Sequence, residues 1–306
     1  MEESLNSERF YINGRLQIVL DLEIGYMDDF ITLVLLLGHP LVNLKAITIV
    51  PGTPDEIGFL RHVLAIFNRA DIPLGVFDMN AKSIVSAFDY KVYYSTEIKE
   101  SREASDACDI LLTHCDENTI LVCGGPLTNV SKAIQTGKFR LGRLVVQGGF
   151  AGDNIVPSNK RIDKLNGQLT STAFNLDSNV QSALNVLQDK TIKEKFFVSK
   201  NVCHRVHYNR DMHKQLEPIK DKSLSLKEIY RIMSIYLDSI NIDGEIFHDP
   251  LTACCAIDPT IGEWRDVELY FDEQVKEWGS RIVEYPNVKI TVDYNHSSFL
   301  NTLFAY

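Results

Sequence analysis

The sequence QIVLDLEIGYMDD, from Gln17 to Asp29, gives the strongest indication of the fold. It begins as a short apolar run that ends in acids, a pattern typical of a parallel strand buried on both faces. Asp28 and Asp29 then precede an apolar stretch of helical length that ends at Gly38-His39-Pro40. An acid at the start and Gly-x-Pro at the end are typical helix boundaries. We therefore expect a strand, a carboxylate-rich turn and a helix.

The same alternation continues outward from this stretch. Further strands are expected at 44–50, 75–77, 119–123 and 144–147, and further helices at 55–68, 106–114 and 127–135. Strands that alternate with short helices indicate βαβ units and a mainly parallel sheet. The C-terminal third is mixed, with helices expected at 226–240 and after residue 248, and strands at 267–271 and 288–293. We therefore expect a single α/β domain over residues 1–306, with a mainly parallel sheet flanked by helices and a decorated C-terminal part.

The composition excludes several classes of protein. Hydrophobic residues make up 45% of the 306 residues, which is enough for a core and argues against disorder. The 41 Asp and Glu against 31 Lys and Arg give a net charge of -10, which disfavours a nucleic-acid partner. The longest apolar run, residues 30–38, is far too short to span a bilayer, so we expect no membrane partner. The six cysteines form no CxxC pair and, with no signal-peptide pattern at the N-terminus, predict a cytoplasmic protein.

Four carboxylates lie within nine residues of the first turn: Asp21, Glu23, Asp28 and Asp29. In open α/β sheets, ligands bind beyond the carboxyl ends of the strands, where this turn is expected. Clustered like charges are costly unless a cation compensates them, and hard cations prefer carboxylate oxygens. One of the two consecutive acids could simply cap the helix. Four acids around a glycine turn nevertheless favour a metal site.

Two further motifs are ambiguous when each is taken alone. Cys123-Gly-Gly-Pro-Leu-Thr-Asn129 can present bare backbone carbonyls to a ligand, but it is also an ordinary strand-to-helix turn. In Phe247-His-Asp-Pro250, Asp249 could be a helix cap before a proline, with His248 an incidental surface histidine.

In their order along the chain, these motifs resemble the inosine-uridine-preferring nucleoside hydrolase family. The family's first motif is Asp-x-Asp-Pro-Gly-x-Asp-Asp, and residues 21–29 match it with one extra residue, Glu for the second Asp and Ile for Pro. The resemblance extends over residues 17–260 and includes Val50-Pro-Gly-Thr53, Gly124-Gly-Pro-Leu-Thr-Asn129, Gln147-Gly-Gly149 for Met-Gly-Gly, Ala173-Phe-Asn175 for Glu-Phe-Asn, and His248-Asp249-Pro250. The chain is identified as a divergent member.

The resemblance implies calcium-dependent hydrolysis of the N-glycosidic bond of a ribonucleoside, which releases the free base and ribose. It assigns the Ca²⁺ ligands to the carboxylates of Glu23, Asp29 and Asp249 and to the carbonyl of Gly124, with ribose hydroxyls and a water in the remaining positions. Glu23 would also be the general base for the water, and His248 would donate a proton or a hydrogen bond to the departing base.

Substrate contacts follow from the same resemblance. They are assigned to Asp21 or Asp28, which would orient the ribose hydroxyls or the base, and to Thr53, Gln147 and Asn175. Ala173 stands where the family has the acid that holds the ribose 5′-hydroxyl. A modified base or a 5′-substituted sugar is therefore as acceptable as a common nucleoside.

The departures from the family pattern leave alternatives open. Glu23 reaches one methylene further than Asp, so either the extra residue reshapes the turn or Asp21 shares the ligand role. Tyr90, Tyr93 and Tyr94 form either a stacking wall for a base or ordinary packing. Residues 152–164 are either a mobile lid or an exposed connection. Asn201 and His204 either line the pocket or, as we favour, form a structural turn.

Two other functions remain open. The first is a catalytically weakened protein on the same fold that binds or senses a nucleoside. The second is a hydrolase of a larger ribosyl conjugate such as nicotinamide riboside. Because homo-oligomers are frequent in the family, we expect a dimer or tetramer.

Overall fold

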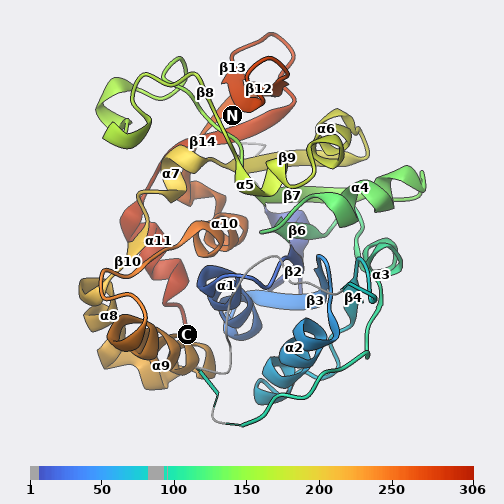
Figure 1. Cartoon of the computed structure of the whole chain (residues 1–306), viewed down its shortest axis with the longest axis vertical. Helices are drawn as coiled ribbons and strands as arrows, with labels where there is room; N and C mark the ends of the chain where they lie inside the picture. Colours follow the sequence, from blue (N-terminus) through green and yellow to red (C-terminus); the bar gives the residue numbers. More distant parts are fainter. Residues whose placement is uncertain (1–6, 82–92, 95) are drawn as a thin grey trace.

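A twelve-stranded sheet with helices on both faces is the framework of the computed structural model, which describes residues 7–81, 93–94 and 96–306 (Figure 1). The strands are β1 (Tyr11–Ile12), β2 (Arg15–Leu22), β3 (Val42–Ile49), β4 (Leu74–Val76), β5 (Ser105–Asp106), β6 (Ile120–Cys123), β7 (Leu141–Gln147), β8 (Thr170–Ser171), β9 (Ile192–Val198), β12 (Gly262–Asp272), β13 (Glu277–Arg281) and β14 (Val288–Tyr294); β10 (His207–Tyr208) and β11 (Glu245–Ile246) form a separate pair. The helices are α1 (Met27–Gly38), α2 (Pro54–Ile66), α3 (Ala107–His114), α4 (Thr128–Gln135), α5 (Phe174–Asp177), α6 (Val180–Gln188), α7 (Lys200–Cys203), α8 (Arg210–Leu216), α9 (Leu224–Ser239), α10 (His248–Ile257) and α11 (His296–Leu303).

The greater part of the sheet is parallel. The order is β5-β4-β3-β2-β6-β7-β9-β14-β12-β13-β8, and every pairing from β5 to β14 is parallel. β12, β13 and β8 then add an antiparallel extension at the β14 edge. The expected α/β domain with a parallel sheet is therefore confirmed, and this extension is the decoration expected in the C-terminal third.

Strand β2 and helix α1 occupy the centre of the fold. β2 pairs with β3 on one side and β6 on the other, so its residues after Arg15 are all buried. α1 is buried from Met27 to Leu36 because the sheet covers one side and helices α9 and α10 cover another. A helix that is apolar on all sides is stable only in such a place.

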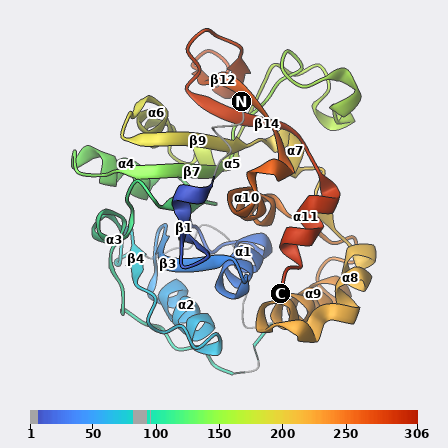
Figure 2. The same ribbon diagram turned by 180° about the vertical axis from the view of Figure 1, so that it is seen from behind.

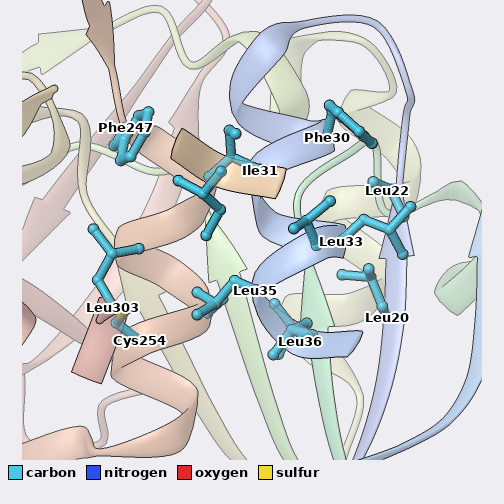
Figure 3. Packing of buried hydrophobic residues seen from close by; sticks show 14 of the residues in the cluster. Leu20, Leu22, Phe30, Ile31, Leu33, Leu35, Leu36, Phe247, Cys254 and Leu303 are labelled. Atoms are coloured by element: carbon cyan, nitrogen blue, oxygen red, sulfur yellow. The ribbon is translucent and has the colours of Figure 1, made fainter. Parts of the chain in front are cut away.

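The core has two layers, one on each face of the sheet. One contains side chains of α1, α2, α9, α10 and α11, and the other contains those of α3, α4 and α6 (Figure 2). Figure 3 shows the first layer from close by: Leu33 and Leu36 point toward β2, whereas Ile31 and Leu35 point toward Cys254 of α10. This packing fixes the starts of α1 and α10 against each other.

Most expected elements are present within a few residues of their predicted bounds. Helices α5, α6, α7, α8 and α11 and the short strands β1, β5, β8, β10, β11 and β13 were not predicted. Among the helices of the described residues, none combines the length and apolarity that a membrane crossing requires.

Candidate active site

A cavity of about 630 Å³ lies where the carboxyl ends of β2, β6 and β7 meet the starts of α1, α5 and α10. Its floor and walls are formed by Glu23, Tyr26, Asp28, Asp29, Gly124, Gln147, Gly148, Gly149, Thr172, Ala173, Phe174, Asn175, Asp177, Ser178, Lys200, His204, Glu245, His248 and Asp249. This position agrees with the general rule for ligand sites in open α/β sheets.

Three aspartates converge in the cavity. Asp28 and Asp29 open α1 and Asp249 lies in the first turn of α10, with one carboxylate oxygen of each within 4.8 Å of the others. Backbone donors hold two of them: Asp29 Oδ2 accepts from Gly25 N–H at 2.9 Å and from Tyr26 N–H at 2.8 Å, and Asp28 Oδ2 accepts from Asp249 N–H at 3.3 Å. The two helix starts therefore set the orientation of the cluster.

The electrostatics of the cluster are those of buried acids without a counter-charge. Burial raises the pKa of Asp28 to about 6 and, together with the charges of Asp28 and Glu56, raises the pKa of Glu23 to about 7. Burial and neighbouring carboxylates also raise the pKa of Asp29 and of Asp249 well above their usual range. Such a group of acids favours a bound cation.

Two further observations fit a divalent cation at this place. In the described part of the chain, the buried oxygens Glu23 Oε2 and Asp249 Oδ1 have no hydrogen-bond partner. A Cβ atom on Gly124 would lie 2.8 Å from the carboxyl group of Asp249, so only glycine lets the backbone approach that carboxylate so closely. Carboxylate and carbonyl oxygens are the ligands of a hard cation.

Glu23 and Asp28 are placed differently with respect to the cluster. Asp28, which we assigned to the substrate, is a member of the aspartate cluster. Glu23 lines the same cavity but is not part of that group of three.

Asp21 and Thr53, two predicted substrate residues, do not line the cavity. Asp21 is fully buried, and its carboxylate accepts hydrogen bonds from Thr48 Oγ1 at 2.6 Å and Asn129 Nδ2 at 2.8 Å. Thr53 caps α2, where its backbone N–H donates to Glu56 Oε2 at 2.7 Å. The bonds of Asp21 connect β2 to β3 and α4, whereas those of Thr53 stay within the start of α2.

Residues 18–301 of this chain match the family model described as inosine-uridine preferring nucleoside hydrolase. The chain belongs to this family. It is therefore a hydrolase that acts on N-glycosyl compounds, and the family is metal-dependent.

Relatives of this nucleoside hydrolase are distant but match over nearly their whole length. An uncharacterized protein of Aquifex aeolicus is 25% identical, with 91% of this chain and 94% of the relative covered. The pyrimidine-specific ribonucleoside hydrolase RihA of Klebsiella pneumoniae is also 25% identical, with 94% and 97% covered. The solved structure of a purine-preferring ribonucleoside hydrolase from Gardnerella vaginalis has the same fold, with a TM-score of 0.68, 16% identity, and 94% and 96% covered.

A chain of hydrogen bonds follows one wall of the hydrolase cavity. Asn175 Nδ2 donates to Gln147 Oε1 at 2.8 Å, and Gln147 Nε2 donates to Cys203 Sγ at 3.4 Å. Cys203 Sγ lies 2.9 Å from His248 Nδ1. Burial raises the pKa of the Cys203 thiol to about 12, so the thiol keeps its proton and can donate it to Nδ1. This series of hydrogen bonds therefore connects Asn175 and Gln147, two predicted substrate residues, to His248, the predicted proton donor.

His248 is neutral at physiological pH in this environment. Burial, followed by the charges of Lys164 and Lys200, lowers its pKa to about 4. When the thiol of Cys203 donates to Nδ1 and not to the Lys200 carbonyl 3.6 Å away, the neutral ring carries its proton on Nε2.

Several residues of the cavity were not predicted or were left open. Lys200 and Glu245 line the cavity but belong to no motif that we recognised, and Tyr26 lies within the acidic motif without having been assigned a role. His204 lines the cavity, contrary to the structural turn that we favoured. Asn201 does not, because its Oδ1 accepts from the backbone N–H of Ala151 at 3.1 Å.

Tyr93 and Tyr94, two of the tyrosines considered for a stacking wall, lie away from the cavity. Tyr94 packs against Phe30 and Phe59, with ring centroids 6.3 Å and 6.2 Å away, and neither Tyr93 nor Tyr94 lines the cavity. Tyr90 lies outside the described residues. Aromatic rings at the cavity come instead from Tyr26 and Phe174, which meet edge to face with centroids 6.0 Å apart.

Proposed function

We propose that this hydrolase cleaves the N-glycosidic bond of a ribonucleoside by using one Ca²⁺ ion at the floor of the cavity. The observation that carries the proposal is the convergence of Asp28, Asp29 and Asp249 beside two buried, unpartnered carboxylate oxygens. Calcium suits this place because it takes six to eight oxygen ligands in flexible geometry. The ligands would be Glu23, Asp29, Asp249 and the Gly124 carbonyl, with Asp28 either a further ligand or the partner of a ribose hydroxyl.

The bound cation would lower the pKa of a water and orient the ribose hydroxyls. Glu23 would accept the proton of that water, a role that suits a carboxylate whose pKa is raised to about 7 by burial and neighbouring acids. His248 would donate from Nε2 to the departing base, because Nδ1 is occupied by the thiol of Cys203. Asn175 and Gln147 would hold the sugar between these two groups.

The C5′ end of the sugar is the part of the proposed substrate that the cavity restricts least. Ala173 lines the cavity with a side chain that has neither charge nor volume to reject a group on C5′. A modified base or a 5′-substituted sugar therefore remains within the proposed substrate class.

A catalytically weakened protein that binds or senses a nucleoside is the second candidate. Glu in place of the family's Asp at position 23 favours it, because a displaced base would bind water without deprotonating it efficiently. Incubation of the calcium-loaded protein with a panel of common, modified and 5′-substituted nucleosides separates the two functions. Release of base and ribose supports the hydrolase, whereas tight binding of nucleosides without release supports the sensor.

The metal assignment has its own test. Asp249→Ala removes one charged ligand and should weaken Ca²⁺ binding by at least roughly 10–100-fold, the range that even a supporting residue of a metal site costs. Calorimetric titration of the metal-free protein measures this loss. Asp266→Ala, which removes a surface carboxylate paired with Lys289, is the matched control and should bind as the parent does. Full occupancy of the Asp249→Ala variant would contradict the assignment.

We infer that the protein is cytoplasmic, since all six cysteines are free and buried, as expected in a reducing compartment. We also propose a homo-oligomer, a dimer or tetramer, on the basis of the family resemblance. Light scattering of the purified protein tests the oligomeric state.

A further inference from the structure

We propose that the ribosyl substrate carries a 5′-phosphate and that Lys200 binds it at the wall of the cavity. This inference rests on the proposed function and narrows its substrate class. It starts from the uneven charge of the cavity, which is acidic on the floor and basic on one wall.

The basic wall is formed by Lys200 and His204, with Lys164 behind them. Lys200 and His204 line the cavity, and Lys164 Nζ lies 3.3 Å from His204 Nδ1. Burial is the main reason that the pKa of His204 is lowered to about 4, and the charges of Lys164 and Lys200 contribute. The two ammonium groups are therefore close enough to act on the same imidazole.

Neither lysine is neutralised by an acid. Within the described part of the chain, no carboxylate oxygen lies within 4.0 Å of the ammonium group of Lys164 or Lys200. Lys200 Nζ instead donates to Ser171 Oγ and to the carbonyl of Thr172, each at 3.0 Å. These neutral acceptors hold the ammonium group in place, and Asp177 and Glu277 act on its charge only from beyond ion-pair distance.

The position of Lys200 matches the expected path of a 5′ substituent. In a β-ribonucleoside the base and C5′ leave the same face of the sugar, so a ribose held through its 2′ and 3′ hydroxyls at the floor points both groups away from the floor. Lys200 is fixed on Thr172, the residue before Ala173, which stands where the family has the acid that holds the 5′-hydroxyl. The acid is thus missing beside a lysine that forms no direct ion pair among the described residues.

Asp177, the acid of the cavity that is nearest to Ala173 in the sequence, already has hydrogen-bond partners. Asp177 accepts a hydrogen bond from Trp278 Nε1 through Oδ1 and one from the Ala173 backbone N–H through Oδ2, each at 2.9 Å. These bonds hold both oxygens in the scaffold and stabilise the negative charge there. A phosphate, with two negative charges and several acceptor oxygens, can then approach Lys200.

The test compares each nucleoside with its own 5′-monophosphate. For uridine and inosine, kcat/KM is measured with the calcium-loaded protein on both forms, and the ratio of the two values is the readout. We expect the wild-type ratio to exceed 1 and Lys200→Met to lower it by at least tenfold. Lys200→Arg retains the cation and should keep most of the preference, which separates the charge from any disturbance of the loop.

Lys193→Met is the matched control. Lys193 lies near the start of β9, whereas Lys200 follows the carboxyl end of the same strand, and Lys193 does not line the cavity. Its substitution should leave the ratio at the wild-type value. A drop in Lys193→Met as large as in Lys200→Met would overturn the inference.

The remaining outcomes distinguish this inference from the proposed function. Hydrolysis of nucleosides but not of their monophosphates, or a ratio unaffected by Lys200→Met, overturns the 5′-phosphate and leaves the hydrolase intact. A preference for orotidine, whose carboxylate is on the base, over orotidine 5′-monophosphate assigns Lys200 to the base and also overturns the inference. Failure to release base from any of these compounds overturns the proposed function itself.

Discussion

His248 shows how a single buried side chain can be prepared for one step of a reaction. Its ring is neutral, its Nδ1 faces a thiol 2.9 Å away, and it lines the cavity one residue before Asp249 of the acidic cluster. A neutral imidazole with its proton on Nε2 can donate a hydrogen bond to a leaving group and stabilise the negative charge that develops there.

His248→Ala should therefore affect substrates according to their leaving group. We expect hydrolysis of ordinary nucleosides to slow by roughly 10²–10⁴-fold, the usual value of one general acid. Hydrolysis of p-nitrophenyl riboside, whose leaving group needs no protonation, should slow far less. Steady-state kinetics on both substrates give the comparison, and an equal loss on the two would indicate a structural role.

Ala173 is the residue at which this chain departs most clearly from the family in the cavity. Ala173→Glu should restore an acid near C5′ and repel a 5′-phosphate, because like charges are costly at short range. We expect kcat/KM for 5′-substituted ribonucleosides to fall at least about tenfold, equivalent to about 1.4 kcal/mol, with plain ribonucleosides spared or improved. Unchanged relative rates on the two classes would show that position 173 does not contact the 5′ group.

Among the elements, α7 connects Gln147, at the end of β7, to His248 at the start of α10 through contacts of Cys203. This four-residue helix carries Lys200 at its start and Cys203 at its end, directly after β9. Because β9 lies between β7 and β14 in the sheet, α7 is held at the carboxyl edge where the cavity lies. Cys203 is thus a positioning residue for His248 on α10.

Cys203→Ser and Cys203→Ala separate positioning from packing. Serine retains a hydroxyl that can donate to His248 Nδ1, whereas alanine leaves the ring without that partner. We expect Cys203→Ala to lose more activity on nucleosides than on p-nitrophenyl riboside, by about tenfold, and Cys203→Ser to recover most of that difference. If both variants behave alike on the two substrates, the thiol only fills space.

The elements also show what the sequence could and could not predict. The strands and helices from β2 to β7, except the two-residue β5, were predictable because apolar runs alternate with capped amphipathic or apolar segments there, as in Thr53 at the start of α2. β8 and β13 were not, because they are short and antiparallel and depend on a tertiary pairing, Trp278 with Ser171. The aspartate cluster follows from motifs with a recognisable order.

The basic wall does not follow from any motif. Lys200 and His204 belong to a turn whose composition is that of any polar connection, and only the return of β9 to the carboxyl edge brings them to the cavity. Asp21 illustrates the opposite case: its place in an acidic motif suggested a ligand contact, yet its strand directs the carboxylate to Thr48 and Asn129. Asp21 lies within β2 and is paired on both sides by β3 and β6, whereas Glu23 follows the end of the strand and can turn into the cavity.

At the scale of the whole molecule, the acidic cluster couples metal binding to stability. Asp28, Asp29 and Asp249 are buried where the two central helices start, so their mutual repulsion opposes the packing of α1 against α10. A cation that binds only the folded protein removes this repulsion and stabilises by mass action.

Chelation of the metal should therefore destabilise the protein in a pH-dependent manner. The folded-state pKa values are raised, to about 6 for Asp28 and about 7 for Glu23, from model values of 3.8 and 4.5. The folded protein without metal thus binds more protons than the unfolded chain, and this contribution to stability is present at low pH and lost as pH rises through 6 and 7. We expect EDTA to lower the melting temperature by several degrees at pH 8 and by much less at pH 5. Scanning calorimetry with and without the chelator, and with Ca²⁺ restored, measures the difference. An equal effect of EDTA at both pH values would show that the carboxylates of Glu23, Asp28, Asp29 and Asp249 do not bind the cation.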